Sequence, residues 1–410
     1  MKDGLEIGEK IRMKNLSVLA HLLAGEDPIA PVDWDDMLYW AGRHSCGARL
    51  FERVKQLTGP GGPPATVWRT LQAAYYAAVV QDAYREVELQ RVFSALQAAQ
   101  VPALLLKGAA LAYQVYAQSR WRLTGDLDVL VKVDDVKRAQ AVLEELGYCL
   151  VLEPPQRFNP FNTAFTGEIV LRHVAGVFQT VVEVHWELII SDVYKQVSRL
   201  NLAELWPRAV EVQIGEVRVT VLNREDVLWH TCVHLALHGF THLKGYLDVA
   251  LLAASPALDW EAFTQQVVQS RTRIACYFPL WWAQQVFGAA IPAAVLRRLQ
   301  PGRSRRWLGQ WLLRRGTQME VSTGYAWEHL VVFTLADRLS DWLRMVAWLF
   351  FPGCDWLQAR YHLRSRWQTV AWVVIHPALV ISEGLRSLAL LMARRAGTRK
   401  SPRYQKGQST

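Results

Sequence analysis

Apolar residues recur every three to four positions through the first hundred residues, which is the spacing of an amphipathic helix. Two shorter stretches of this kind cover residues 16–25 and 32–57, and Asp33 supplies a helix-capping residue type at the start of the second. The sequence TGPGGPPA at 58–65 predicts a loop. Residues 67–100 combine good helix formers with helical spacing, so they predict one long helix.

Between residues 101 and 192 the hydrophobic period shortens to two, which is the spacing of strands. GDLDVLVKV at 125–133 alternates and is rich in branched residues, and the apolar segments that begin at residues 148, 168 and 180 are similar. Residues 134–148 predict a helix between them. This arrangement predicts an α+β fold with a small mixed β-sheet, flanking helices, and helical regions at both ends of the chain.

Beyond Asp192 the pattern is helical again. No run reaches the roughly eighteen apolar residues of a membrane-spanning helix. VAWVVIHPALVI at 370–381 comes near, and we expect His376 and Pro377 to break it. The predicted regions are an N-terminal helical region (1–100), an α/β core (101–192), a helical substrate or cleft domain (193–296), a basic tryptophan-rich helical region (297–396) and a disordered tail (397–410).

The formal charge of +9 suggests a nucleic-acid partner, but its distribution argues against one. From Arg297 onward there are 19 Lys and Arg against 6 Asp and Glu, a balance of +13, so residues 1–296 carry −4. No nucleic-acid recognition motif accompanies the basic region. Eight of the 18 tryptophans lie between residues 307 and 372. This composition fits helices that lie peripherally on a membrane, and equally an ordinary helical domain with a basic rim.

The five cysteines are scattered and show no CxxC spacing, which favours reduced thiols over a disulfide framework. The N-terminal sequence is charged and has no apolar signal core. We therefore expect a cytoplasmic protein, with peripheral membrane contact as the possibility that the basic region leaves open.

Two aspartates interrupt the apolar strand segment, and they are the first candidates for chemistry. Asp126 and Asp128 lie two apart, so both point to one face of the strand. Adjacent carboxylates repel unless a cation lies between them, and Mg²⁺ is commonly held by one or two carboxylates together with substrate phosphates. Glu183, in a second predicted strand, is a candidate third carboxylate, and His185 lies on the same face.

A triphosphate needs a binding element of its own, and the Lys107-Gly108 pair is the candidate. Glycine lets the backbone approach phosphate closely, and the helix expected after it offers free N–H groups. Lys107 adds a point charge. Arg122, four residues before Asp126, offers a forked donor.

Taken in order, LLLKGAALAYQ, RLTGDLDVLV, VEVHWEL and LNREDVLWHTCVHLALHGFTHLKGYLDVALL resemble the uncharacterised bacterial nucleotidyltransferase family. That family belongs to the superfamily of DNA polymerase beta and the aminoglycoside nucleotidyltransferases. The resemblance covers roughly residues 15–255, and it implies a nucleotidyltransferase core with Asp126, Asp128 and Glu183 as metal ligands. One departure is that the superfamily has a serine after its glycine, whereas Ala109 follows Gly108 here.

The function that this resemblance implies is Mg²⁺- or Mn²⁺-dependent transfer of a nucleoside monophosphate from an NTP, with ATP the favoured donor. The acceptor is a hydroxyl of a small molecule, a peptide or a saccharide. Lys107, Gly108, Arg122 and His185 are the expected nucleotide-binding residues. Three alternatives stay open: γ-phosphoryl transfer by a kinase, a non-catalytic nucleotide-binding scaffold, and a membrane adaptor built on the basic helices.

Histidines recur every four residues at positions 230, 234, 238 and 242. The first three lie on one face of a helix, and Gly239 is expected to end that helix before His242. A zinc site is one interpretation. We favour the other, in which the helix packs its polar face near the nucleotide or the acceptor.

Overall fold

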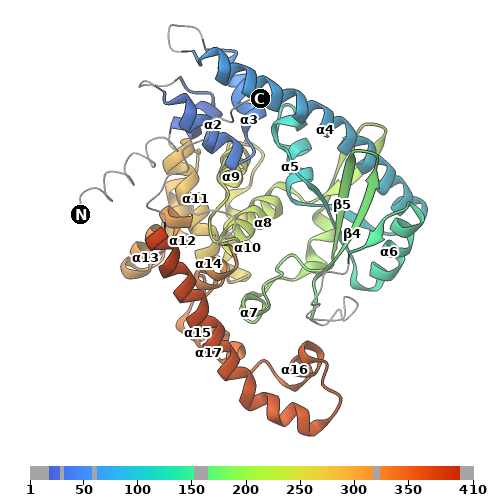
Figure 1. The fold of residues 1–410 in the computed structure, drawn as a ribbon, viewed down its shortest axis with the longest axis vertical. Coiled ribbons are helices and arrows are strands. Elements are labelled where there is room, and N and C mark those ends of the chain that lie inside the picture. Colours follow the sequence, from blue (N-terminus) through green and yellow to red (C-terminus); the bar gives the residue numbers. More distant parts are fainter. Residues whose placement is uncertain (1–17, 28–31, 58–61, 152–164, 317–323, 398–410) are drawn as a thin grey trace, which may run out of the picture.

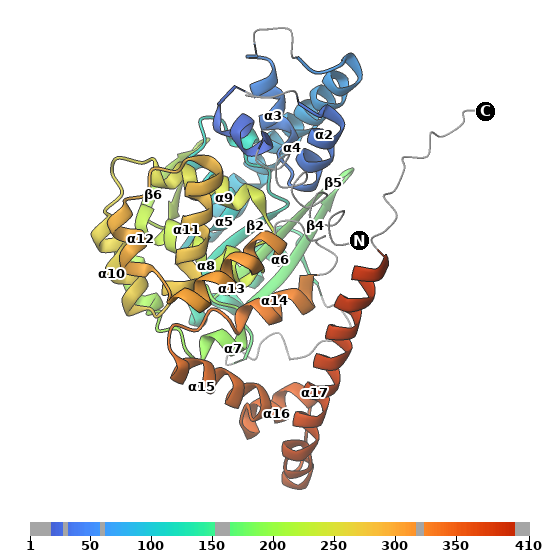
Figure 2. The same ribbon diagram turned by 90° about the vertical axis from the view of Figure 1, so that its left-hand side faces the viewer.

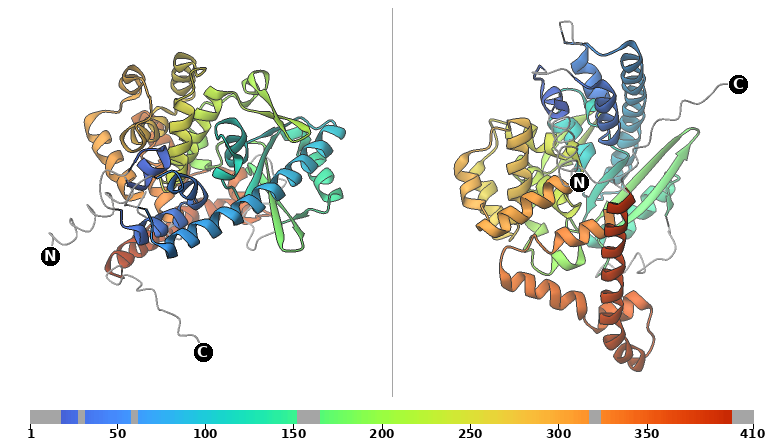
Figure 3. Two further views of the ribbon diagram at one scale, coloured as in Figure 1. Left: turned by 90° about the horizontal axis from the view of Figure 1, so that it is seen from above. Right: turned by 60° about the vertical axis from the view of Figure 1, so that its left-hand side comes forward.

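A computed structural model describes residues 18–27, 32–57, 62–151, 165–316 and 324–397. Almost all of the predicted disordered tail, from residue 398, lies outside the described residues. Figure 1 shows a β-sheet with its own helices on one side of the molecule and a group of packed helices on the other, with further C-terminal helices projecting below. The two halves are also distinct in the view from above in Figure 3.

Seven strands form one mixed sheet in the order β3-β4-β5-β2-β1-β7-β6. β2 pairs in parallel with β5, and β1 pairs in parallel with β7, whereas the other neighbours are antiparallel. This sheet with flanking helices confirms the predicted α+β class. The strands are β1 (Ala103–Leu105), β2 (Asp126–Val131), β3 (Cys149–Leu150), β4 (Glu168–Ala175), β5 (Phe178–His185), β6 (Val210–Ile214) and β7 (Val217–Val221).

The alternating sequence of β2 serves two different cores. Leu127 and Val129 are buried in a core shared with α4 (Ala65–Ala98) and α6 (Val136–Glu145). Leu130, on the opposite face, belongs to the larger core that the helical half builds. Side chains alternate along a strand, so Asp126 and Asp128 point to the same side as Leu130, between the sheet and the helical half.

The N-terminal helices follow the sequence pattern closely. The predicted long helix is α4, which has 34 residues. The carboxylate of Asp33 accepts the N–H of Asp36 and caps α2 (Trp34–Arg43), as expected. α4 contacts α2 and α3 (Gly47–Val54) as well as α6 and strands β5 and β7, so it joins the N-terminal helices to the sheet. It is the long diagonal helix in Figure 1.

The other helices connect strands or build the helical half. Between strands lie α5 (Lys107–Gln114), η1 (Ser119–Trp121), η2 (Val133–Asp135), α7 (Asp192–Lys195), η3 (Leu202–Glu204) and η4 (Trp206–Arg208). The helical half contains α8 (Arg224–Leu237), α9 (Leu243–Ala253), α10 (Trp260–Gln269), α11 (Arg273–Phe287), α12 (Ala293–Leu299), α13 (Arg303–Gly316) and α14 (Gly324–Val332). The C-terminal helices are α15 (Leu339–Phe350), α16 (Cys354–Tyr361) and α17 (Arg366–Gly397).

Two expectations were wrong. The chain after Asp192 was expected to be helical, yet β6 and β7 form a hairpin that extends the sheet beyond β1. The sequence VEVQIGEVRVTV at 210–221 alternates around Gly215, which adopts the left-handed φ of +56° that a tight turn requires. This local alternation was the signal for a hairpin.

The second correction concerns Pro377, which was expected to break the last apolar segment. α17 runs through it as one helix of 32 residues. Proline removes one backbone hydrogen bond, but α17 packs against α15 and α16 through the part before Pro377, where Thr369 and His376 are buried. Its segment Arg366–Arg386 is long and apolar enough to cross a membrane by length and composition, and little of it is buried.

The five cysteines are free thiols, as expected.

Candidate active site

The parallel pairing of β2 with β5 brings the predicted acidic residues together. In its register Asp128 lies opposite Glu183, and Leu130 lies opposite His185. The neighbouring side chains Val182 and Val184 are buried in the core shared with α4 and α6, so Glu183 and His185 point to the other face, where Asp128 lies. The grouping depends on two segments that are more than fifty residues apart in the sequence.

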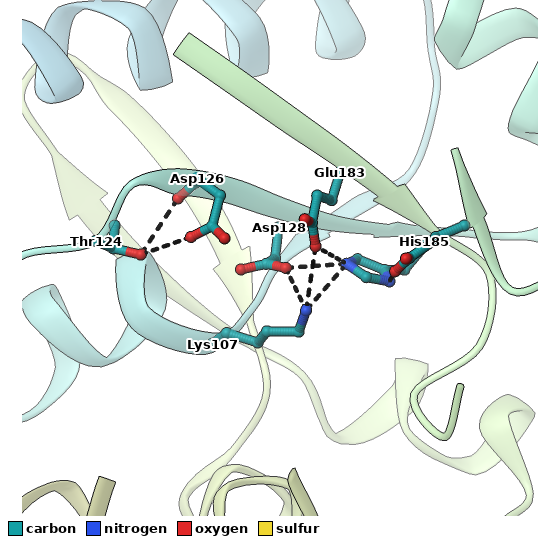
Figure 4. Close-up of polar contacts among 7 residues, drawn as sticks. Lys107, Thr124, Asp126, Asp128, Glu183 and His185 are labelled. Atoms are coloured by element: carbon teal, nitrogen blue, oxygen red, sulfur yellow. Dashed lines mark hydrogen bonds and ion pairs between the residues drawn. The ribbon is translucent and has the colours of Figure 1, made fainter. Parts of the chain in front are cut away.

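Lys107 lies on this group of acidic residues (Figure 4). Its Nζ is 2.5 Å from Oδ1 of Asp128, 3.3 Å from Oε2 of Glu183 and 3.3 Å from Nε2 of His185. Although burial acts in the opposite direction, the charge of Asp128 raises the pKa of Lys107 above its ordinary value. Lys107 also has a left-handed backbone with φ of +48°, an uncommon conformation for a residue with a side chain. We refer to Lys107, Asp128, Glu183 and His185 as the carboxylate cluster.

His185 is buried as deeply as Asp128 in the carboxylate cluster. Its Nε2 lies 2.9 Å from Oδ1 of Asp128, and its Nδ1 lies 3.0 Å from Oε2 of Glu168 on β4. Burial lowers its pKa, but hydrogen bonds to Asp128, Glu168 and Glu183 outweigh it and raise the pKa to about 10. The ring is therefore protonated at neutral pH. Glu168 was not recognised from the sequence.

The two carboxylates of the cluster respond differently to the same neighbours. A hydrogen bond from His185, helped by the charge of Lys107, lowers the pKa of Glu183. Burial instead raises the pKa of Asp128, although Lys107 and His185 oppose the change. Glu183 is therefore ionised at neutral pH, whereas Asp128 depends on its cationic neighbours to remain so.

The donor atoms of the cluster fit a divalent cation. The described residues contain one group of three potential metal ligands, Asp128, Glu183 and His185. Their ligand atoms lie within 4.8 Å of one another. Two carboxylate oxygens and an imidazole suit Mg²⁺ or Mn²⁺, and the imidazole favours Mn²⁺ of the two. The ammonium of Lys107 lies between these three atoms. It therefore occupies the position of a metal ion and balances the charge of the carboxylates.

Asp126 lies beside the cluster and faces Thr124. The hydroxyl of Thr124 donates to Oδ1 of Asp126 at 2.8 Å. It also lies against Gly108, where an added Cβ would be only 2.7 Å from that hydroxyl oxygen. Thr124, at the end of the segment that returns to β2, therefore places a hydroxyl beside Gly108, which Ala109 follows in the sequence. Its only signal in the sequence is its place two residues before Asp126.

Arg122 lies on the carboxylate of Asp248 in α9. Its Nε donates to the two carboxylate oxygens at 2.8 and 3.0 Å, and the hydroxyl of Tyr116 donates to Oδ1 at 2.6 Å. Although burial acts against it, the charge of Asp248 raises the pKa of Arg122. Asp248 therefore ties the segment before β2 to the helical half.

Lys244, one turn before Asp248 on α9, is a second cation near the aspartates. Burial and then the charge of Arg122 lower its pKa, while Asp248 and Asp126 act in the opposite direction. Within the part of the chain that the structure describes, its ammonium has no ion-pair or hydrogen-bond partner. Lys244 was not singled out from the sequence, because only the packing of α9 brings it to this position.

The four histidines form a row along α8 and beyond its end. Successive ring centroids from His230 through His234 and His238 to His242 are separated by 6.0, 4.3 and 6.0 Å. Burial lowers the pKa of His230 to about 3 and that of His234 well below its ordinary value, so both rings are neutral. The described residues show no converging set of ligand atoms in this row. His230 interacts electrostatically with Lys107 and His185, which agrees with a polar helix face beside the cluster.

Three comparisons relate the chain to other proteins. A family model described as "Uncharacterised nucleotidyltransferase" matches residues 30–288, which is more than half of the chain. Among solved structures, an antigenic nucleotidyltransferase-like protein from Paracoccidioides brasiliensis is similar at 14% identity with a TM-score of 0.30, over 54% of this chain and 96% of that chain. No protein of curated function matches. The residues matched by the family model include all the predicted site residues.

Proposed function

The chain belongs to the family of uncharacterised nucleotidyltransferases, and on this premise we propose that it is a metal-dependent enzyme that transfers a nucleoside monophosphate from an NTP to an acceptor hydroxyl. ATP is the favoured donor. The acceptor is a small molecule, a peptide or a saccharide. The membership supports nucleotidyl transfer in general, and the roles of individual residues are inferred from the geometry below.

One observation carries the proposal. The face of β2 and β5 between the sheet and the helical half holds Asp126, Asp128 and Glu183, with a glycine helix start and a threonine hydroxyl beside them. Acidic side chains on neighbouring strands are the ligands that a divalent ion and a triphosphate require.

Asp128 and Glu183 would hold the divalent ion, with Asp126 as the further carboxylate and His185 as a nitrogen ligand once its Nε2 has lost its proton. When bound, such an ion neutralises the phosphate oxygens and favours displacement at phosphorus. Lys107 then exchanges one anion for another, because its ammonium leaves Asp128 and pairs with the triphosphate. The first-turn N–H groups of α5 lack intrahelical partners and a side-chain cap, so they are available to phosphate oxygens.

In the reaction, the acceptor oxygen forms a bond to the α-phosphorus, the bond from that phosphorus to the β-phosphate oxygen breaks, and pyrophosphate leaves. The hydroxyl proton goes to Glu183, which is ionised at neutral pH. Arg122, buried on Asp248, fixes the segment that carries Thr124 and Asp126. Lys244, whose ammonium has no partner among the described residues, lies near Asp126, so it supplies the direct phosphate contact that the ion pair of Arg122 prevents.

Binding is the first test. We expect calorimetry to show ATP binding that requires Mg²⁺ or Mn²⁺, and we expect Asp126→Asn/Asp128→Asn to abolish it. Asp134→Asn, an exposed aspartate after the same strand, is the matched control and leaves binding unchanged. A folded wild type that bound no NTP with either metal ion would refute the proposal.

Labelled ATP then separates the transfer reactions. With a metabolite extract as the source of acceptor, α-labelled ATP transfers its label and pyrophosphate appears if the enzyme is a nucleotidyltransferase. Transfer of a γ-label identifies a kinase instead. ATP binding without turnover that neither requires the metal ion nor changes in Glu183→Gln identifies a non-catalytic scaffold in which Lys107 takes the place of the metal ion.

A further inference from the structure

The C-terminal helix α17 has one docked face and one free face. On the docked face, the ring nitrogens of His376 lie 2.9 Å from the hydroxyl of Tyr361 and 3.1 Å from the carbonyl of Leu349. The hydroxyl of Thr369 accepts from Gln358 at 3.1 Å. Both side chains are buried. This face is therefore fixed to α15 and to α16.

The free face carries a stripe of exposed apolar side chains. Its members recur at helical spacing, so they lie along one side of the helix. The stripe is about 27 Å long at 1.5 Å per residue. Its members, with their exposed fractions, are Trp367 (84%), Val370 (60%), Val374 (74%), Ile381 (54%) and Leu385 (63%). We refer to these five residues as the α17 stripe.

Soluble surfaces seldom leave apolar side chains exposed along such a length without a partner. α15, which packs against α17, adds exposed Leu339 and Leu343, and Phe351 follows it. Figure 2 shows α17 at the margin of the molecule. The stripe is therefore open to a flat and extended surface.

The charges around the stripe indicate what that surface is. Arg364 and Arg366 precede the stripe and Arg386 follows it, and no acidic residue lies between Arg366 and Glu383. The chain from Arg297 onward carries a balance of +13. A tryptophan beside arginines at the end of an apolar stripe is typical of helices that lie at the boundary between lipid headgroups and acyl chains. A protein partner would have to provide an apolar groove and negative charge over the same length.

We propose that α17 lies in the plane of a membrane that contains anionic lipid, with the α17 stripe in the acyl boundary and the flanking arginines on the headgroups. A spanning orientation is disfavoured, because His376 and Thr369 would have to leave their partners and enter the hydrocarbon core. The inference does not depend on the proposed nucleotidyl transfer.

The test is co-sedimentation of the full chain with vesicles of phosphatidylglycerol and phosphatidylcholine. Wild type is expected to sediment with these vesicles and only weakly with pure phosphatidylcholine. Val370→Ser/Val374→Ser is expected to weaken partitioning by roughly tenfold or more, since it removes two apolar side chains that the membrane would bury. Arg364→Gln/Arg366→Gln is expected to reduce the preference for phosphatidylglycerol by roughly tenfold or more, because two basic side chains lose their attraction to the anionic headgroups.

Val174→Ser/Val177→Ser is the matched control, since these two valines are 62% and 93% exposed and lie on the β4–β5 hairpin. It is expected to partition like wild type. Wild type that stays in the supernatant with anionic vesicles overturns the proposal, as does an equal loss in the control. Sedimentation velocity without lipid provides a further check. A wild-type dimer that becomes a monomer in Val370→Ser/Val374→Ser assigns the stripe to a second copy of the chain and also overturns the proposal.

Discussion

Lys107→Met is expected to tighten the binding of Mn²⁺ in the absence of nucleotide. In the wild type, the ammonium lies 2.5 Å from Asp128 and 3.3 Å from Glu183, at the point where the potential ligands converge. A divalent ion can reach these carboxylates only after the lysine has left. Methionine keeps the length of the side chain and removes its charge, so the ion no longer competes with an internal cation.

The size of the effect follows from the burial of the pair. The side chains of Lys107 and Asp128 are 17% and 1% exposed. Breaking a buried ion pair costs about 3–5 kcal/mol, and the lower end applies because the lysine retains some contact with water. Since about 1.4 kcal/mol corresponds to a factor of ten, the Mn²⁺ dissociation constant is expected to fall by about a hundredfold.

Free Mn²⁺ measured by electron paramagnetic resonance gives the dissociation constant directly. Lys137→Met, at an exposed lysine, is the control and is expected to match wild type. In the presence of Mn²⁺, the same Lys107→Met variant is expected to bind ATP more weakly, because the triphosphate loses its cationic partner. A folded variant that bound Mn²⁺ no more tightly than wild type would refute the idea that Lys107 and the metal ion share one position.

Three further predictions concern the surroundings of the cluster. Gly108→Ala is expected to weaken ATP binding about tenfold or more, because its Cβ would lie 2.7 Å from a threonine hydroxyl, whereas Gly125→Ala, with nothing within 4 Å, is expected to leave it unchanged. Asp248→Asn is expected to lower the free energy of unfolding by about 3 kcal/mol, because it leaves a buried guanidinium without its anion, whereas Glu261→Gln, in an exposed pair, is expected to have little effect on urea unfolding. Burial lowers the pKa of His44 to about 3, so the folded protein resists protonation that the unfolded chain accepts near 6.5. Stability is then lost as the pH falls below 6.5, by about 2 kcal/mol at pH 5 from this residue, and His44→Gln is expected to remove that share of the loss.

Each of these predictions has an outcome that contradicts it. Equal ATP affinity in the Gly108 and Gly125 variants means that the close approach at Gly108 has no part in binding. An unchanged unfolding free energy in Asp248→Asn means that the ion pair with Arg122 contributes nothing net. Identical acid sensitivity in wild type and His44→Gln means that His44 is not the neutral buried group that its surroundings indicate.

The residue types of the cluster were predictable from the sequence, because strand alternation places Asp126 and Asp128 on one face without further information. Lys107 and Gly108 were also found from a local pattern, a lysine-glycine pair before an expected helix. The position of Lys107 relative to the carboxylates was not predictable. The parallel register of β2 with β5 is a long-range contact, and only that register shows that the ammonium lies on the carboxylates rather than facing outward.

Long-range contacts also explain why other residues of the site were missed. Thr124 and Lys244 reach the site through the return of one segment and the packing of one helix, and neither leaves a periodic signal in the sequence. Arg122 was expected at the phosphates because of its spacing from Asp126, but its partner Asp248 lies 126 residues further along the chain. The hairpin of β6 and β7 differs from these cases, since its alternating valines were visible and were given too little weight beside the helices around them.

The parallel pairing of β2 with β5 also determines when the site exists during synthesis. His185 follows Asp128 by 57 residues, so β1, α5, β2 and α6 have all left the ribosome before Asp128 has a partner on β5. Pairing across such a separation is slow compared with the formation of local helices. A nascent or truncated chain that ends before β5 lacks Glu183 and His185 and therefore has no assembled ligand set. The pairing of β5 with β2 brings these potential ligands to Asp128 together, so they are acquired in one pairing event rather than one by one.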